Sequence, residues 1–121
     1  MEEVRSLSAA KTKILVVSRD PKLGDTRRKV LEEAGYEVVS ASDPESLVGV
    51  NLESVRLVVV GYSLKPSEKR RIWVKARELC NAPVLEFFRN GGPELIEANH
   101  FHESQAPDDF IEKVRQIFSG S

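Results

Sequence analysis

The sequence has one cysteine and lacks long apolar runs, and each scarcity excludes a class of protein. A single cysteine, Cys80, cannot form an internal disulfide or supply a multi-cysteine zinc site. The longest apolar runs, such as residues 57–60, fall far short of the roughly 18 residues that span a bilayer. The first residues also lack a basic start followed by an apolar stretch. We therefore expect a soluble, cytoplasmic protein.

The sequence also lacks an excess of either charge. Eighteen Lys and Arg against 19 Asp and Glu give a formal net charge of −1, which favours neither a nucleic acid nor an anionic membrane as partner. Its 121 residues, 40% of them hydrophobic, suffice for one core. We predict one domain over residues 12–118, with a flexible segment over residues 1–11 and a tail over residues 119–121.

Short β-branched runs alternate with amphipathic segments along this domain. We predict strands at 13–17, 36–41, 55–60, 83–88 and near 100, and helices at 21–34, 43–50, 67–80, near 93–97 and at 107–118. The runs at 14–17 and 57–60 contain no polar residue, which indicates strands that are covered on both faces. The pattern predicts an α/β fold, a doubly wound five-stranded parallel sheet with helices on both sides.

Ligands of such sheets gather at the carboxyl ends of the strands, and the residues expected there are chemically poor. They are Ser18, Arg19 and Asp20 after the first strand, Gly61, Tyr62 and Ser63 after the third, Phe88, Arg89 and Asn90 after the fourth, and Glu103 and Ser104 after the fifth. We expect no enzymatic activity, no cofactor and no metal.

Several segments carry a family resemblance. The run 14–17 followed by Asp20-Pro21, with the segments 28–38 and 41–47, resembles the first half of a response-regulator receiver domain. The likeness continues through 57–60, 82–85 and 108–115, and so covers nearly the whole predicted domain. It implies a CheY-like (flavodoxin-like) strand order of 2-1-3-4-5 and a role in two-component phosphorelay signal transduction.

In that family a histidine kinase passes a phosphoryl group to an aspartate at the end of the third strand. The aspartate and an acidic pair after the first strand bind a divalent metal, while a hydroxyl residue and a lysine contact the phosphoryl group. In this sequence the five matching positions are Ser18 and Arg19 (acidic pair), Gly61 (acceptor), Phe88 (hydroxyl) and Ser104, or Glu103 with a shift of one (lysine). The resemblance therefore implies a degenerate pseudo-receiver without a phosphoacceptor or a metal site.

Two further departures concern Asp20 and the segment after Phe88. Asp20 is a candidate residual metal ligand, but Asp20-Pro21 is typical of a helix N-cap, and we favour the cap. Between Phe88 and Ser104 the chain is about one and a half helical turns shorter than the family, and Gly91-Gly92-Pro93 interrupts its start. The resemblance implies a shortened fourth helix.

Other polar candidates have competing structural interpretations. His100 and His102 share one face of the last predicted strand and form a potential metal pair, although partly buried histidines are favoured. Glu86 interrupts an apolar strand and requires a partner, which we expect to be a histidine or a basic residue of a covering helix. We expect Cys80 to be buried filler.

Two sets of residues are candidate interaction surfaces. The first is a basic cluster, Lys65, Lys69, Arg70, Arg71, Lys75 and Arg77 with Trp73, for which a solvated face is favoured over a nucleic-acid surface, and Trp73 is a candidate anchor for a partner. The second is a set of apolar residues, Phe101, Phe110, Ile111, Ile117 and Phe118, which either meet a partner or close the monomer core.

The sequence thus favours a non-enzymatic signalling module that acts by protein–protein interaction, with a protein partner or as a homodimer. The alternative is a small-anion or nucleotide-binding domain in which Arg19, Arg89 and Ser63 hold an anion at the strand-end crevice.

Overall fold

The computed structural model describes residues 12–47, 52–61, 64–88, 100–102 and 107–120. The elements, in chain order, are β1 (Lys13–Val17), α2 (Pro21–Glu33), β2 (Glu37–Ala41), the 3₁₀ turn η1 (Pro44–Leu47), β3 (Val55–Val60), α3 (Pro66–Leu79), β4 (Val84–Phe87), β5 (His100–His102) and α4 (Pro107–Gly120). Within these ranges, no helix combines the length and apolar character needed to cross a bilayer.

The strands form one parallel sheet in the order β2-β1-β3-β4-β5. The order of the first four strands agrees with the CheY-like arrangement predicted above. The outer strand β5 is short and is joined to β4 through three residue pairs, from Leu85 with His100 to Phe87 with His102.

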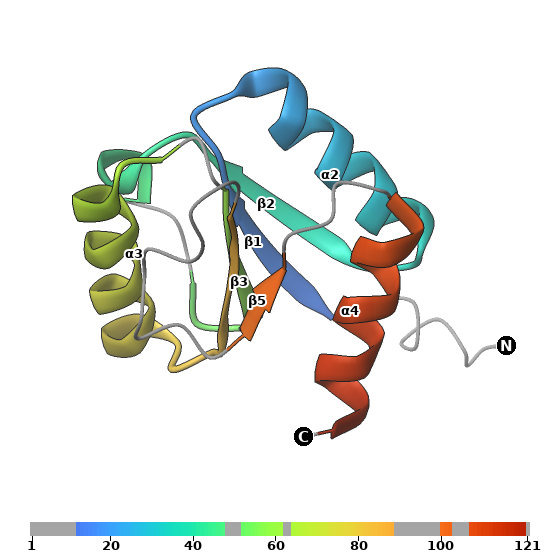
Figure 1. The fold of residues 1–121 in the computed structure, drawn as a ribbon. Helices are drawn as coiled ribbons and strands as arrows, with labels where there is room; N and C mark the ends of the chain where they lie inside the picture. The colour runs from blue at the N-terminus through green and yellow to red at the C-terminus, as the bar shows by residue number, and fades with distance from the viewer. Residues whose placement is uncertain (1–11, 48–51, 62–63, 89–99, 103–106, 121) are drawn as a thin grey trace, which may run out of the picture.

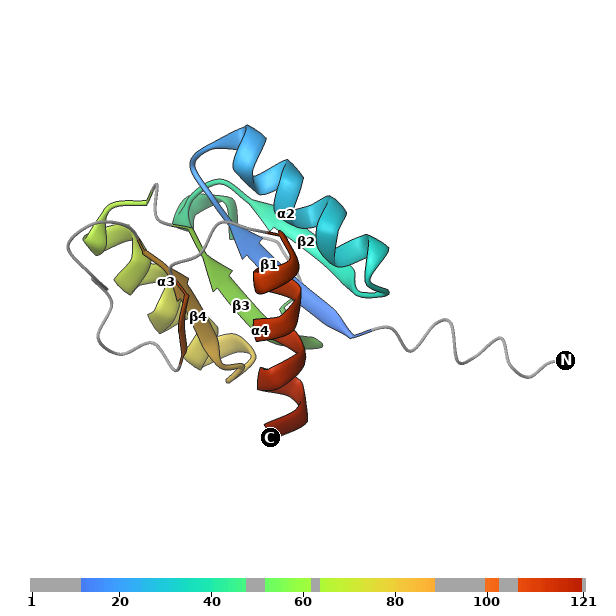
Figure 2. The same cartoon turned by 45° about the vertical axis from the view of Figure 1, so that its right-hand side comes forward.

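Helices cover both faces of the sheet (Figures 1 and 2): α2 and α4 lie on one face, and α3 lies on the other. Alternate residues of each strand supply the two halves of the core. In β1, Leu15 and Val17 pack on the α3 side with Ile72, whereas Ile14 and Val16 pack on the side of α2 and α4. The continuous apolar runs of the sequence therefore correspond to strands buried on both faces, as expected.

Local sequence signals fix the ends of the first helix. The Asp20 carboxylate accepts hydrogen bonds from the backbone N–H groups of Lys22 (2.9 Å) and Leu23 (3.3 Å), and Pro21 begins α2. Gly35, with a φ of 101°, turns the chain toward β2, in a conformation that only glycine adopts without strain.

The prediction of a helix at 43–50 is wrong for the part of this range that the structure describes. Residues 44–47 form a 3₁₀ turn, and residues 48–51 lie outside the described part of the chain. Asp43 provides a physical reason, because its carboxylate accepts hydrogen bonds from the backbone N–H (2.8 Å) and the hydroxyl (2.7 Å) of Ser46. Such local bonds satisfy the backbone without a continuing helix. The shortened fourth helix was predicted for residues that are likewise outside the described ranges.

Candidate functional site

The carboxyl ends of β1 and β3 meet at one edge of the sheet, where ligands of parallel sheets gather. The Gly61 N–H donates to the Val17 carbonyl oxygen (2.9 Å), and the Ser18 N–H donates to the Ala41 carbonyl oxygen (3.0 Å). Ser18 is buried, and its hydroxyl bonds the backbone of Asp20 within the same turn. The fold thus places Ser18 beside Gly61 at this edge, with Arg19 next to Ser18 in the chain.

The space beside Gly61 is filled by the side chain of Arg27 from α2. A Cβ atom placed on Gly61 would lie 2.9 Å from Arg27 Nη1, 3.3 Å from Ser18 Oγ and 3.3 Å from the Val17 carbonyl oxygen. Arg27 is only 5% exposed, and its guanidinium carbon lies 4.1 Å from the centroid of the Phe87 ring, within cation–π range. A guanidinium therefore occupies the position into which a side chain at residue 61 would extend.

Arg27 is a residue that the sequence analysis missed. It lies in the run Arg27-Arg28-Lys29, which is typical of an exposed helix face. The signal that could have found it is its spacing of four residues from both Leu23 and Leu31, since Leu31 is fully buried on the inner face of α2.

Arg19 joins two acidic side chains at the same edge. Its guanidinium donates to the Glu68 carboxylate at the start of α3, and it lies 3.6 Å from the Asp43 carboxylate that follows β2. Glu68 also accepts a hydrogen bond from the Lys65 N–H (3.0 Å). Arg19 thus connects β1 to α3 and to the loop after β2.

These contacts lower the pKa values of both carboxyl groups. The hydrogen bond from Arg19, followed by that from the Lys65 N–H, lowers the pKa of Glu68 below its usual value. Hydrogen bonds from the Ser46 hydroxyl and backbone, with a smaller contribution from the charge of Arg19, lower the pKa of Asp43. Both groups are therefore carboxylates near neutral pH.

The other predicted positions of this edge contribute little that could hold a metal. Asp20 is the N-cap of α2, with Oδ1 facing two backbone N–H groups. Phe88 follows β4 and is partly exposed, and Ser104, like Glu103, lies outside the described residues. Within the described ranges, no three His, Cys, Asp or Glu residues are grouped closely enough to hold a metal ion.

A buried ion pair lies between α3 and β4. Lys69 Nζ is 2.8 Å from Glu86 Oε2, and the two side chains are 1% and 0% exposed. The prediction that Glu86 has a basic partner on a covering helix is confirmed. The assignment of Lys69 to a solvated face was wrong, because the apolar stem of a lysine can be buried where a carboxylate meets its ammonium.

The predicted apolar contact residues lie mostly within the monomer core. Phe110 is buried and packs edge-on against Phe87 at a centroid distance of 5.0 Å. Ile111 and Phe118 pack partly buried on the same side, and Trp73 does so on the other side. His100, Phe101 and His102 form β5, and only their backbone is described. Cys80, partly buried, donates from its thiol to the Ala76 carbonyl oxygen (3.4 Å).

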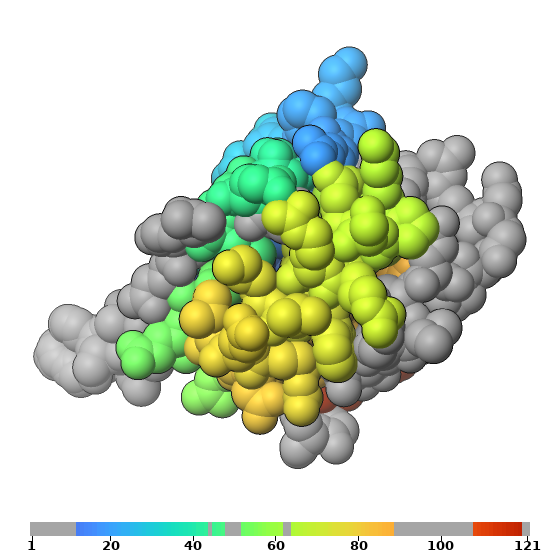
Figure 3. Space-filling view, turned by 90° about the vertical axis from the view of Figure 1, so that its left-hand side faces the viewer, coloured from blue at the N-terminus to red at the C-terminus, as the bar shows by residue number. Residues whose placement is uncertain are grey.

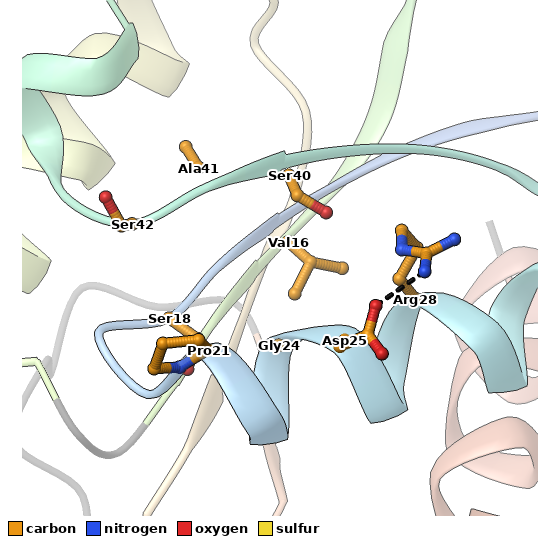
Figure 4. Close-up of a pocket in the computed structure, with 9 residues that line it drawn as sticks. All are labelled: Val16, Ser18, Pro21, Gly24, Asp25, Arg28, Ser40, Ala41 and Ser42. Carbon is orange, nitrogen blue, oxygen red and sulfur yellow. Dashed lines mark hydrogen bonds and ion pairs between the residues drawn. The ribbon is translucent and has the colours of Figure 1, made fainter.

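A shallow pocket lies beside the candidate site, between α2 and strands β1 and β2 (Figure 4). It measures about 290 Å³ and is lined in part by Ser18, Ser40 and Ser42, and the ion pair between Asp25 and Arg28 (2.5 Å) borders it. The pocket shares Ser18 with the carboxyl edge but does not include Gly61.

Comparison with solved structures gives matches to receiver domains over most of the chain. A CheY-like response regulator receiver domain from Methanospirillum hungatei has a TM-score of 0.76 at 22% identity, with coverage of 92% of this chain and 96% of that one. A receiver protein from Sinorhizobium medicae has a TM-score of 0.75 at 18% identity (92% and 97%), and a chemotaxis response regulator from Vibrio cholerae has 0.74 at 15% (89% and 99%).

Comparison of the sequence with protein-family models gives no match, and comparison with curated proteins gives none either. At these identities the structural likeness establishes the fold, which is the α/β fold of CheY-like receiver domains. What the edge of the sheet does must be argued from its own residues.

Proposed function

We propose that this chain is a receiver-like signal-transduction domain that has lost phosphoryl transfer and acts by binding another protein. The observation that carries the proposal is the buried Arg27 side chain, which packs beside Gly61 at the end of β3. The sequence resemblance matches the family's phosphoacceptor to Gly61, and glycine offers no nucleophile.

The chemistry of phosphoryl transfer supports this proposal. The reaction needs an oxygen nucleophile and a cation that neutralises the charge developing on the phosphoryl group. Magnesium prefers carboxylate ligands, whereas Ser18 and Arg19 stand where the acidic pair would be. The buried Arg27 guanidinium adds a fixed positive charge beside Gly61, which opposes the binding of a second cation there.

The contacts of Arg19 weigh against the alternative function, a small-anion or nucleotide site. An incoming anion would have to displace the carboxylates of Glu68 and Asp43 from that guanidinium. The other two residues of that hypothesis, Arg89 and Ser63, lie outside the described residues.

A titration of the isotopically labelled protein with magnesium and beryllofluoride, a phosphoryl mimic, tests the proposal. We expect no saturating change in the amide chemical shifts of residues 18–20 and 61. Saturating shifts there would refute it. In parallel, a thermal-shift screen with nucleotides and inorganic phosphate tests the alternative, which predicts stabilisation of several degrees at ligand concentrations far above Kd.

A further inference from the structure

The outward face of α3 carries a single stripe of side chains. The inward residues of this helix, among them Ile72 and Ala76, are buried against the sheet. The residues at helical spacing on the other side line a hollow of about 490 Å³ along the helix: Ser67, Arg70, Arg71, Val74, Lys75 and Glu78. We call this set the α3 stripe, and Figure 3 shows the face of the molecule on which the α3 side chains gather.

The α3 stripe combines positive charge with an apolar centre. Arg70, Arg71 and Lys75 supply three cations, against one acid, Glu78, at the C-terminal end. Between them lies Val74, 42% exposed, which with Leu79 is one of the two large hydrophobic residues exposed in the described part of the chain. Complementary charge steers partners to a surface, so three cations along one helix face favour a partner that carries negative charge there.

We infer that the α3 stripe binds an acidic, amphipathic helical segment of a protein partner. An apolar side chain of that segment would cover Val74, and its carboxylates would face Arg70, Arg71 and Lys75. This inference rests on the proposed function, a domain that acts through protein contacts, and it assigns the surface and the charge of the partner.

The ion pair that the α3 stripe forms within the chain can be replaced by one with a partner. Arg71 forms an ion pair with Glu45 (2.5 Å), but both side chains are more than half exposed. Exposed ion pairs contribute little to stability, so a partner carboxylate can replace Glu45 at little cost. Glu78 gives the surface a direction, because the acidic part of the segment must lie over Arg70 and Arg71, away from Glu78.

The same features favour an acidic protein over a nucleic acid. Glu45 and Glu78 interrupt the cations, so this face offers no continuous basic track for a phosphate backbone, whereas the carboxylates of a short peptide can be spaced to avoid them. Trp73, the aromatic residue of this helix, is packed partly buried against the core with Arg77 near its ring, and so does not present a stacking platform for bases.

The test uses two synthetic peptides of equal composition and one oligonucleotide, each titrated into the labelled protein and followed by amide chemical shifts. One peptide places Glu and Leu at helical spacing on one face, and the other has the same residues scrambled. The third probe is a single-stranded DNA of mixed sequence. We expect the amphipathic peptide to shift residues 67–78, with an affinity that falls as salt is raised.

Three variants sharpen the result. Lys75→Glu reverses a charge of the α3 stripe and should weaken peptide binding about tenfold, and Val74→Ser should weaken it about threefold by removing apolar contact. Arg115→Glu, a matched charge reversal at an exposed position of α4, should leave the affinity unchanged. All three side chains are at least partly exposed, and the spectrum itself reports whether each variant folds.

Equal binding of the scrambled peptide, shifts confined to other elements, or equal weakening by Lys75→Glu and Arg115→Glu would each overturn the inference. Preferential binding of the oligonucleotide at α3 would also overturn it and would assign the surface to nucleic acid. None of these outcomes bears on the proposed loss of phosphoryl transfer at Gly61, which the beryllofluoride titration tests separately.

Discussion

At the scale of single residues, the space at the end of β3 can hold either the Arg27 guanidinium or a side chain at residue 61, but not both without a shift. The Arg27 guanidinium lies 2.9 Å from where a Cβ of residue 61 would be, closer than side-chain carbons approach such groups. The guanidinium is the end of a flexible side chain and can shift, whereas the Val17 carbonyl, 3.3 Å from the same point, belongs to the sheet. A substitution at Gly61 therefore acts first on Arg27.

Gly61→Asp provides the corresponding prediction. We expect that the new carboxylate pairs with Arg27 and accepts no phosphoryl group, because the acidic pair that would hold magnesium is absent. Intact-mass spectrometry after treatment with acetyl phosphate and magnesium measures this directly. Gly61→Ala, which adds the same Cβ without a charge, is the control for the steric effect. A stoichiometric gain of one phosphoryl group in Gly61→Asp would contradict the account.

A second prediction concerns Glu68 and pH. Its pKa is lower in the folded chain than in the unfolded chain, so the folded state binds fewer protons in acid. The stability that the Arg19 contact contributes is complete above the unfolded pKa of about 4.3 and is lost as the pH falls through the lower folded value. Glu68→Gln should be less stable than the parent at pH 7.

The difference between Glu68→Gln and the parent should shrink as the parent carboxyl is protonated. Urea unfolding of both proteins from pH 7 to pH 3 gives the comparison, and Glu33→Gln, at an exposed position near the end of α2, is the control. A difference that stays constant over this range would mean that the charge of Glu68 contributes nothing to folding.

At the scale of elements, the strands and long helices were predictable, because the apolar runs and the helical spacing of apolar residues correspond to the buried positions. The polar contacts between elements were not predictable in the same way. Arg19 and Glu68 are 49 residues apart, and no local pattern in the sequence joins them. Arg27 and Lys69 lie at inward helical positions, but their charge favoured an exposed interpretation over the periodicity.

The 3₁₀ turn at Pro44–Leu47 illustrates a second limit of the sequence. Asp43, Pro44 and Glu45 are the residues that open a helix, and the sequence pattern could not tell one turn from several. The length of such an element depends on what it packs against, here α3, and that contact is set by the assembled fold. Start signals are local, whereas helix length is decided by tertiary packing.

The attachment of α3 to β4 yields the third prediction. Lys69→Met alone should destabilise the protein by about 3–5 kcal/mol, because it leaves the Glu86 carboxylate buried without the ammonium that lies 2.8 Å from it. Lys69→Met combined with Glu86→Leu should recover most of that loss, because an apolar pair of similar volume carries no desolvation cost.

Urea unfolding of both singles and the double gives the coupling energy of the pair. If the double variant were as unstable as the sum of the singles, the pair would not act as a unit.

At the scale of the whole molecule, the described apolar residues of α4 are used within the monomer. Phe110 packs on Phe87, and Phe118 lies 5.7 Å from Tyr36 between ring centroids, so these side chains contribute to the core. The predicted contact surface at this helix is therefore smaller than its apolar content implied. Self-association through these side chains of α4 would compete with their contacts in the core.

We accordingly expect the chain to be monomeric in dilute solution. Light scattering and sedimentation from micromolar to about millimolar concentration, which spans ordinary weak-dimer affinities, measure this. A dimer that Val74→Ser disrupts would mean that a second copy of the chain covers the α3 stripe. A dimer unaffected by that substitution would place the contact on another face.

The sharing of space between Arg27 and Gly61 also has an evolutionary consequence. Under the proposed function, a reversion at residue 61 alone gives an ion pair with Arg27 instead of a metal site, and a change at Arg27 alone empties a packed position without adding a nucleophile. Neither single step is rewarded by selection for phosphoryl transfer. Under the proposed function, recovery of phosphoryl transfer therefore requires several substitutions together, at Ser18, Arg19, Arg27 and Gly61.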